Sequence, residues 1–434
     1  MTFPARGRLV RLASSAGGAV TVQFLNAGGS FVLQATAART LGASGYGAYA
    51  LFTSVLVMIT AVQTSWVGDS LTVFDRFERR LRGGIEISVL VTVGAGVAVS
   101  VLISASMGLA GPGGTGLFGL LIALWLMEET GRRVFTARME FWRLVLNDTC
   151  YLVSTLAIVG AVVATGGEVS VEVLLAAMAV GAATAVIVAW MQLPGTEYQA
   201  VPLRNTAFRE ILSFASWRSV QAGVRPAALL GARMLIAAFA SQAVLGGIEA
   251  ARLLLAPALT FVNGSGWYLL GDYAKAQKSG RPLPAATALR ACAAMAGITL
   301  VLSLAGVVSA DWVAPYVTGG AFTVDRVALA GWAVYAVSLS CTLPLSSLAT
   351  ARKRSRLVFG VRGVESVTGL VVLVVLLVAD PAWAPYAPYC LGGGGLVSAA
   401  LLWRLLRRED PGRTGSGIPV GMPATDGHAV GAPS

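Results

Sequence analysis

Four arginines lie within long apolar stretches of the chain, where charged side chains are rare. They are Arg218, Arg225, Arg233 and Arg252. A charged group at the centre of a bilayer costs about 2.5–3.5 kcal/mol on insertion scales, so such a group normally faces a cavity or a partner. A guanidinium group forks onto phosphate oxygens and loses its hydration more readily than an ammonium group does. These residues therefore predict a cationic wall suited to phosphate groups.

Spacing along the chain decides which of these arginines can share a surface. Arg218 and Arg225 are seven residues apart and fall on one helix face. Arg252 follows Glu249 by three residues, which allows an ion pair on a helix. A plainer interpretation stays open: Arg218 and Arg233 can extend to the two membrane surfaces, and Arg252 can pair with Glu249 and bind no ligand.

Other polar residues stand at the ends of the apolar stretches or inside the first one. Arg39 is either an interfacial anchor or a fifth member of the arginine set. Amides on the first stretch could line a cavity or bond another helix, and these are Gln23, Asn26 and Gln34. Three acidic residues could bind a coupling cation or proton, or could instead cap helices and pair with arginines. They are Asp69, Asp148 and Glu249.

The elements that position these residues follow from the composition. Of 434 residues, 56% are hydrophobic and only 12% are charged, against about 25% charged in soluble domains. A single soluble domain and a disordered chain are both excluded. A spanning helix needs about 20 mostly apolar residues. Twelve segments qualify, at roughly 14–38, 46–68, 85–108, 116–137, 144–165, 169–192, 211–239, 243–270, 287–309, 327–349, 357–379 and 385–406.

The basic residues give these twelve segments an orientation. The termini and the even-numbered connections hold 26 lysines and arginines, Arg362 among them, whereas the odd-numbered connections hold only Arg39 and Arg326. Cytoplasmic connections are the basic ones, so both termini are predicted to be cytoplasmic. The bias towards Gly, Ala, Val and Arg, with few Lys, is typical of a high-GC bacterium, so the expected location is a bacterial plasma membrane. The net charge of +11 then reflects orientation, and nucleic acid is not expected as a partner.

Two charged ladders lie at this basic side. Glu128, Glu129, Arg132 and Arg133 have the i, i+4 spacing of ion pairs, which we expect to be structural and to lie at the cytoplasmic rim. Glu365 follows Arg362 by three residues, and this spacing predicts another pair.

A weak internal repeat suggests two halves of six helices. The segments 44–50 and 245–251 both place glycines at the start of a helix, about 200 residues apart. Parallel repeats of this kind favour two bundles with a cavity between them. The predicted organisation is an all-α protein with an N-terminal lobe at 1–192, a cytoplasmic linker at 193–210, a C-terminal lobe at 211–408 and a disordered tail at 409–434. The longest internal connections are expected at 193–210 and 309–326.

Metal and nucleotide chemistry have little support. The single histidine, His428, lies in the tail. The four cysteines are far apart and form no CxxC pair; they are Cys150, Cys292, Cys341 and Cys390. No GxxxxGK[ST] motif is present, which argues against ATP use through a P-loop in this chain. We therefore expect no metal site and no cofactor.

Two stretches resemble the multidrug/oligosaccharidyl-lipid/polysaccharide (MOP) flippase superfamily. The segment 38–49, with Gly45, Tyr46 and Gly47, is similar to the turn before that family's second helix. The segment 246–257 resembles its eighth helix, with Arg252 and, five residues later, Pro257. The segment 132–148 is a weaker likeness. The resemblance implies two lobes around a central cavity that open alternately to the two sides of the membrane.

The resemblance also implies a substrate class, that of the polysaccharide-export (Wzx-like) flippases. Such a protein would move a lipid-linked saccharide unit from the cytoplasmic to the outer leaflet. Its partners would be a polyprenyl-diphosphate-linked saccharide and membrane lipids, together with glycosyltransferases and a polymerase of the same pathway. The arginines above would then bind the diphosphate, and the chain would not be an enzyme.

Three other functions stay open. A cation-coupled drug or small-solute antiporter would favour acidic groups in a lobe cavity, whereas the central charges here are mainly basic. A major-facilitator transporter is suggested by 75–80, although Glu78 replaces the glycine expected there. A membrane enzyme would need a large outer loop or paired acids, and the outer connections are short, with Asp311 and Asp325 their main acids.

Overall fold

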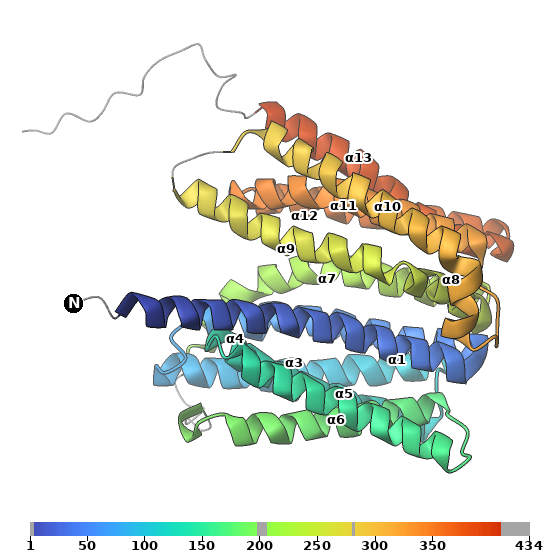
Figure 1. Cartoon of the computed structure of the whole chain (residues 1–434), viewed down its shortest axis with the longest axis horizontal. Helices are drawn as coiled ribbons and strands as arrows, with labels where there is room; N and C mark the ends of the chain where they lie inside the picture. Colours follow the sequence, from blue (N-terminus) through green and yellow to red (C-terminus); the bar gives the residue numbers. More distant parts are fainter. Residues whose placement is uncertain (1–3, 198–205, 280–282, 409–434) are drawn as a thin grey trace, which may run out of the picture.

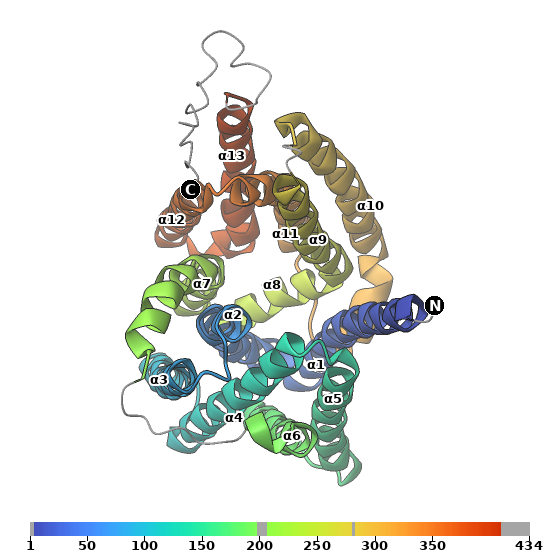
Figure 2. The same ribbon diagram turned by 90° about the vertical axis from the view of Figure 1, so that its left-hand side faces the viewer.

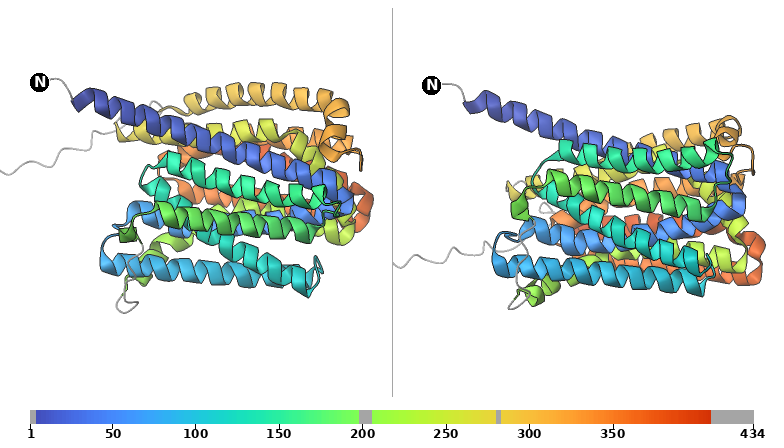
Figure 3. Two further views of the ribbon diagram at one scale, coloured as in Figure 1. Left: turned by 60° about the horizontal axis from the view of Figure 1, so that its bottom comes forward. Right: turned by 90° about the horizontal axis from the view of Figure 1, so that it is seen from below.

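The chain folds almost entirely into helices. The computed structural model describes residues 4–197, 206–279 and 283–408, and no strand occurs in these ranges (Figure 1). The predicted tail with His428 and the centre of the predicted linker lie outside the described residues. The described helices run side by side along the length of the molecule, as the prediction of an all-α membrane protein requires (Figure 3).

Twelve predicted spans correspond to these helices. The first six are formed by α1 (Pro4–Gln63) with its extensions η1 (Thr64–Gly68) and α2 (Asp69–Val73), then α3 (Arg79–Ser106), α4 (Pro112–Ala137), α5 (Phe141–Ala164) and α6 (Val171–Gln192). A short 3-10 turn, η2 (Gly195–Glu197), follows. The last six are formed by α7 (Phe208–Phe239), α8 (Gln242–Leu254) with α9 (Ala256–Lys278), α10 (Ala285–Thr318), α11 (Arg326–Ala351), α12 (Ser355–Ala379), and η3 (Pro381–Tyr386) with α13 (Ala387–Arg408).

Two spans differ in form from the expectation. The first two are joined in α1, which changes direction at Gly42, where φ is 65° and ψ is −178°. This left-handed region costs a glycine little and a side chain much. The eighth span is broken between α8 and α9 with a bend of 63°. Pro257, at the start of α9, has no N–H to donate to the preceding turn.

Length and composition support membrane spanning for most of these helices. Within the described ranges, nine helices are long and apolar enough to cross a membrane, or ten if the bent pair counts as one. The segment Thr21–Val73 counts once among them although it contains the turn at Gly42. Helix α4 is not among them, because it carries the charged residues of the ladder that begins at Glu128.

The ends of the helices differ in charge, as predicted. We call the side where α1 begins and α13 ends the basic end, because the lysine- and arginine-rich connections gather there; Figure 2 looks onto it. The turn at Gly42 and the connection after α10 lie at the opposite, far end (Figure 1). Two expectations were wrong. Helix α10 extends to Thr318, so most of the expected connection 309–326 is helical, and Arg362 lies inside α12 rather than in a connection.

Two groups of helices are visible when the molecule is seen from the basic end. Helices α1–α6, the N-terminal bundle, lie in the lower part of Figure 2, and α7–α13, the C-terminal bundle, lie in the upper part. One large apolar core contains residues of both bundles. Within the N-terminal bundle, Phe52 packs against Phe118 at a ring distance of 4.6 Å. Helix α1 makes the main contacts between bundles, against α7 and α8.

The two bundles meet most closely where α1 crosses α8 near the far end. A Cβ atom on Gly47 would overlap the carbonyl oxygen of Gln242, and one on Gly246 would overlap that of Ala43. Gly47 and Gly246 are 199 residues apart in the chain, and so are Ala43 and Gln242. The contact therefore joins equivalent positions of the repeat. The rings of Tyr46 and Phe322 stack beside it, 6.3 Å apart. Backbone contact of this kind closes the far end between the bundles.

Candidate functional site

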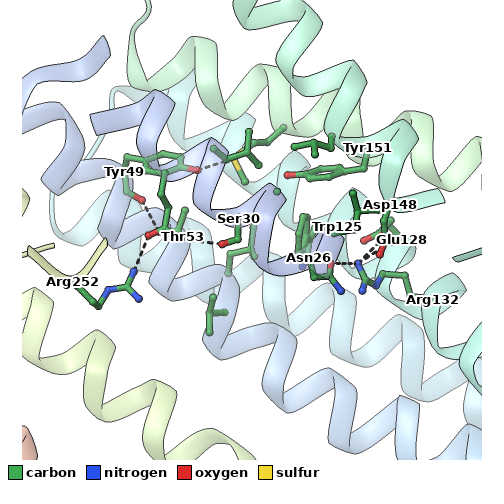
Figure 4. Close-up of a pocket in the computed structure, with 18 of the residues that line it drawn as sticks. Asn26, Ser30, Tyr49, Thr53, Trp125, Glu128, Arg132, Asp148, Tyr151 and Arg252 are labelled. Carbon is green, nitrogen blue, oxygen red and sulfur yellow. Dashed lines mark hydrogen bonds and ion pairs between the residues drawn. The ribbon is translucent and has the colours of Figure 1, made fainter. Parts of the chain in front are cut away.

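A cavity of about 270 Å³ lies between α1, α4 and α5 and reaches α7 and α8 (Figure 4). We call it the main cavity. It follows α1 from Asn26 to Gln34, which are eight residues or about 12 Å apart on a helix. Figure 4 shows charged side chains at its two ends, with Arg252 at one and Arg132 at the other, and aromatic side chains between. The cavity therefore offers three different chemical surfaces.

The first surface is made by α7 and α8 and consists of Arg233, Arg252 and the glutamate that both bind, Glu249. We call these three residues the arginine triad. The carboxylate of Glu249 accepts from Arg233 at 2.7 and 2.8 Å and from Arg252 at 2.6 Å. Glu249 is 1% exposed and Arg252 is 28% exposed at the side chain. The predicted pair of Arg252 and Glu249 is thus confirmed. One carboxylate serves two guanidinium groups, so the triad keeps a net positive charge beside the cavity.

The triad also connects the two bundles. Arg252 donates from Nη2 to Oε1 of Gln34 on α1, at 2.9 Å. Arg233 donates from Nη1 to the hydroxyl of Ser54, also on α1. These bonds lie on the basic-end side of the contact between Gly47 and Gly246. Separation of the bundles at the far end would break them.

The second surface is an acidic cluster made by α4 and α5. Arg132 lies 3.0 Å from Asp148, 3.4 Å from Glu129 and 3.9 Å from Glu128. It also donates to Oδ1 of Asn26 at 3.2 Å. The sequence predicts that this ladder is a structural feature of the rim, and the structure differs. Glu128 and Arg132 line the main cavity, because they lie more than a turn before the end of α4 and meet Asp148 of α5 there.

The charge of the acidic cluster is not balanced. Three carboxylates, of Glu128, Glu129 and Asp148, face the two guanidinium groups of Arg132 and Arg133. Within the described residues, five buried oxygens of this region have no hydrogen-bond partner, although one of them, Oδ1 of Asp148, lies at ion-pair distance from Arg132. They are Oε2 of Glu128, Oδ1 and Oδ2 of Asp148, Oδ1 of Asn147 and the hydroxyl of Tyr151. Unpaired buried oxygens of this kind are the groups that would accept a proton or surround a small cation.

The third surface is aromatic and lies between the charged ends. Trp125 packs edge-on against Tyr151 with ring centroids 5.3 Å apart, and its indole donates to Thr60 at 2.9 Å. Tyr49 reaches the sulfur of Met178 at 3.7 Å. Rings fixed in this way offer an apolar wall with polar edges, which is typical of a pocket for an organic ligand.

The structure does not bring the five predicted arginines together. Arg233 and Arg252 line the main cavity. Arg218 pairs with Asp69 at 2.6 Å near the basic end, where it joins α7 to α2. Arg39 is exposed at the far end, with its stem against Gly319, the residue that follows α10. The single cationic wall was therefore wrong, because helix spacing fixes the face of a residue but not the neighbour it meets.

Arg225 belongs to a second, smaller pocket inside the C-terminal bundle. Its Nε donates to the hydroxyl of Tyr335 at 3.0 Å, and its Nη1 lies 3.5 Å from Oδ1 of Asn263. This pocket has a volume of about 40 Å³ and also contains Arg362. We call it the C-terminal pocket.

Of the three amides predicted on the first stretch, two line the main cavity and one does not. Asn26 and Gln34 line it, whereas Gln23 is exposed. Sequence reasoning missed Trp125, Tyr151 and Arg132 as lining residues. For Arg132 alone the sequence contained a signal, since this residue lies five positions before the end of the helix and not at its rim. No group of three or more histidine, cysteine or acidic side chains suited to a metal ion occurs in the ranges that the structure describes.

No family model matches this sequence, and no curated protein matches it either. Its fold, however, is that of MOP superfamily transporters. An inward-facing multidrug resistance transporter of the MATE family is similar with a TM-score of 0.61 and 14% identity, over 89% of this chain and 94% of that one. The lipid II flippase MurJ, in an inward closed conformation, is similar with a TM-score of 0.67 and 9% identity, over 91% and 90%. A MOP transporter from Pyrococcus furiosus, described as having a binding pocket of reverse polarity, scores 0.55 with 14% identity, over 92% and 94%. The predicted MOP-type fold is thereby confirmed.

Proposed function

We propose that this chain, which has the fold of MOP superfamily transporters, moves a lipid-linked oligosaccharide or polysaccharide unit across the membrane. The two bundles are the moving lobes, and the basic end faces the cytoplasm of a bacterium. Alternating access then opens the main cavity first to the basic end and afterwards to the far end.

The main support is the arginine triad at the wall of the main cavity. Its net charge is positive, and the guanidinium group of Arg252 is partly exposed. A diphosphate can replace the amide of Gln34 as the acceptor for Arg252, because phosphate oxygens accept bidentate bonds from a guanidinium group. The aromatic surface beside it is suited to the first sugar. Binding at this point would release one of the two bonds that join α7 and α8 to α1.

This arrangement links substrate binding to movement. The Arg252–Gln34 bond and the Arg233–Ser54 bond cross between the bundles below the glycine contact. A ligand that binds the triad in competition with Gln34 favours the state in which the bundles are apart at the far end. A ligand shifts such an equilibrium only by its difference in affinity for the two states.

The acidic cluster is the best candidate for coupling to an ion. Of the three acidic residues predicted for that role, Asp69 is bound by Arg218 and Glu249 is bound by two arginines. Asp148 keeps an unpartnered oxygen, beside that of Glu128. A proton or monovalent cation held there would neutralise the net negative charge of the cluster.

The experiment is carried out in cells depleted of the protein. Polyprenyl-linked intermediates are extracted, identified by mass and assigned to a membrane leaflet. We expect one glycolipid to accumulate on the cytoplasmic side, and we expect wild type but not Arg252→Ala to relieve this. Arg326→Ala is the matched control, because Arg326 forms an exposed pair with Asp311 at the far end. An unchanged pool with normal sidedness would contradict the proposal.

A second candidate is a cation-coupled drug or small-solute antiporter. The sequence argued against it because the central charges were mainly basic. The acidic cluster in the N-terminal bundle now favours it, since three carboxylates line or adjoin the main cavity. Drug resistance that depends on this protein, on a cation gradient and on Asp148 would support this candidate.

A further inference from the structure

The C-terminal pocket has an unusual charge balance for a site inside a bundle of helices. It is enclosed by α7, α11, α12 and α13. Three charged side chains line it, Arg225, Arg362 and Glu365. The proposed lipid-linked substrate does not enter this pocket, and the inference below does not depend on that substrate.

Neither arginine of this pocket has an acidic partner. Among the described residues, no carboxylate oxygen lies within 4.0 Å of a side-chain nitrogen of Arg225 or Arg362, whereas the cavity arginines Arg132, Arg233 and Arg252 each have one. Arg225 donates only to neutral acceptors, Tyr335 and Asn263.

Arg362 is left with an unused donor. Its Nη2 donates to the hydroxyl of Ser346 at 3.1 Å, while its Nε is buried without a partner. The pair with Glu365 that the i, i+3 spacing predicted is not formed within 4.0 Å. Glu365 lies instead against the glycines of α13, with Oε1 about 3.0 Å from where a Cβ of Gly395 would be. An uncompensated charge away from water is costly, because the ionised group loses hydration without gaining a counter-charge.

The hydroxyl groups of the pocket cannot replace that counter-charge. Ser338 donates to the carbonyl of Gly392 at 2.6 Å, and Thr342 donates to the carbonyl of Ser338 at 2.7 Å. Their hydrogens point to the backbone, so the donors that remain for a ligand are the guanidinium N–H groups and the hydroxyls of Tyr335 and Ser366.

We propose that the C-terminal pocket binds a small monovalent inorganic anion, of halide type, between Arg225 and Arg362. Two guanidinium groups and one carboxylate give the lining a net charge of one positive unit, which one halide neutralises. The volume sets the size of the ligand. About 40 Å³ holds only a few water-sized spheres of about 10–15 Å³ each, which excludes a saccharide or a diphosphate.

The test uses the full-length purified protein in detergent, without any lipid-linked substrate. Its thermal unfolding midpoint is measured as sodium chloride or bromide replaces sodium gluconate at constant ionic strength. We expect a saturable rise for wild type. Arg362→Gln should raise the half-saturating halide concentration by about tenfold or abolish the rise. Arg326→Gln, at the exposed far-end pair, is the matched control and should respond like wild type.

A second variant keeps the test independent of folding defects. Glu365→Gln removes the only carboxylate of the lining, so it should strengthen the halide response, in the direction opposite to Arg362→Gln. In crystals grown with bromide, the anomalous signal should lie between Arg225 and Arg362. Identical curves in halide and gluconate would overturn the proposal, and so would a response that is equal in Glu365→Gln and Arg362→Gln. The flippase test described above has a separate readout, so either proposal can fail alone.

Discussion

Gly47 and Gly246 each lie against the backbone of the other's helix, at equivalent positions of the two halves of the chain. Neither position has room for a methyl group, because the carbonyl oxygens of Gln242 and Ala43 occupy that space. The bundles are therefore held together at the far end by main-chain contact. The arginine triad lies next to this contact, on its basic-end side.

A methyl group at this contact should push the bundles apart. Gly246→Ala is expected to destabilise the closed arrangement by about 1–3 kcal/mol, as overpacking usually does. Thermal unfolding of the purified protein, together with the reactivity of a single cysteine introduced at Ser54, measures both effects. Gly28→Ala is the control, since nothing lies within 4 Å of its Cβ position. Equal behaviour of the two variants would mean that the contact is not close.

Removal of the shared carboxylate of the triad should strongly destabilise the folded protein. Glu249→Gln leaves two guanidinium groups without their counter-charge, and breaking a buried ion pair typically costs about 3–5 kcal/mol. The change in unfolding midpoint measures this cost. Asp311→Asn breaks a pair that is largely exposed to solvent, for which we expect at most about 1 kcal/mol. A mild effect of Glu249→Gln would show that the triad is solvated.

Substitution of Arg252 by lysine separates charge from geometry. Arg252 bonds Glu249 through Nε and Gln34 through Nη2 at the same time, which one ammonium group on a different stem cannot reproduce. Arg252→Lys should therefore keep the fold but transport less of the accumulated glycolipid than wild type. The assay is the leaflet distribution of the lipid-linked intermediate. Full transport by Arg252→Lys would show that charge alone is sufficient.

Neutralisation of Asp148 should uncouple transport from its driving ion. Asp148→Asn keeps the shape of the side chain and removes one of three carboxylates of the acidic cluster. In vesicles with an imposed proton or sodium gradient, we expect the gradient to accelerate wild type and not this variant. Asp311→Asn serves again as the control. If Asp148→Asn still follows the gradient, the coupling ion binds elsewhere.

The turn between α4 and α5 gives a pH-dependent prediction outside the membrane spans. The hydrogen bond from Arg138 holds the pKa of Glu140 below its ordinary value of 4.5. This ion pair therefore stabilises the folded protein above that pH, and the contribution is lost as the pH falls through the lowered pKa. Glu140→Gln should lower the unfolding midpoint slightly at neutral pH and have no effect in acid. A difference that persists in acid would contradict this assignment.

The sequence was sufficient for the helices and insufficient for their contacts. Apolar length and basic connections located all twelve helical segments, because both are properties of single segments. The Arg252–Glu249 pair was predictable for the same reason, since both residues lie on one helix. The acidic cluster was not, because it depends on Asp148 of α5 meeting Arg132 of α4. Arg362 was assigned to a connection although it lies seven residues inside α12, where no short-range signal distinguishes a surface arginine from a buried one.

The break between α8 and α9 makes the two halves mechanically unequal. In the eighth span the chain bends after Leu254, about 13 residues from the far end. The equivalent second span is continuous there and departs from α-helical form only at Thr64–Gly68, close to the basic end. Positions at the ends of helices absorb backbone rotation most readily. A rocking motion shared by both halves would thus bend the eighth span at the break between α8 and α9. The second span, in the N-terminal half, would move as one rigid helix.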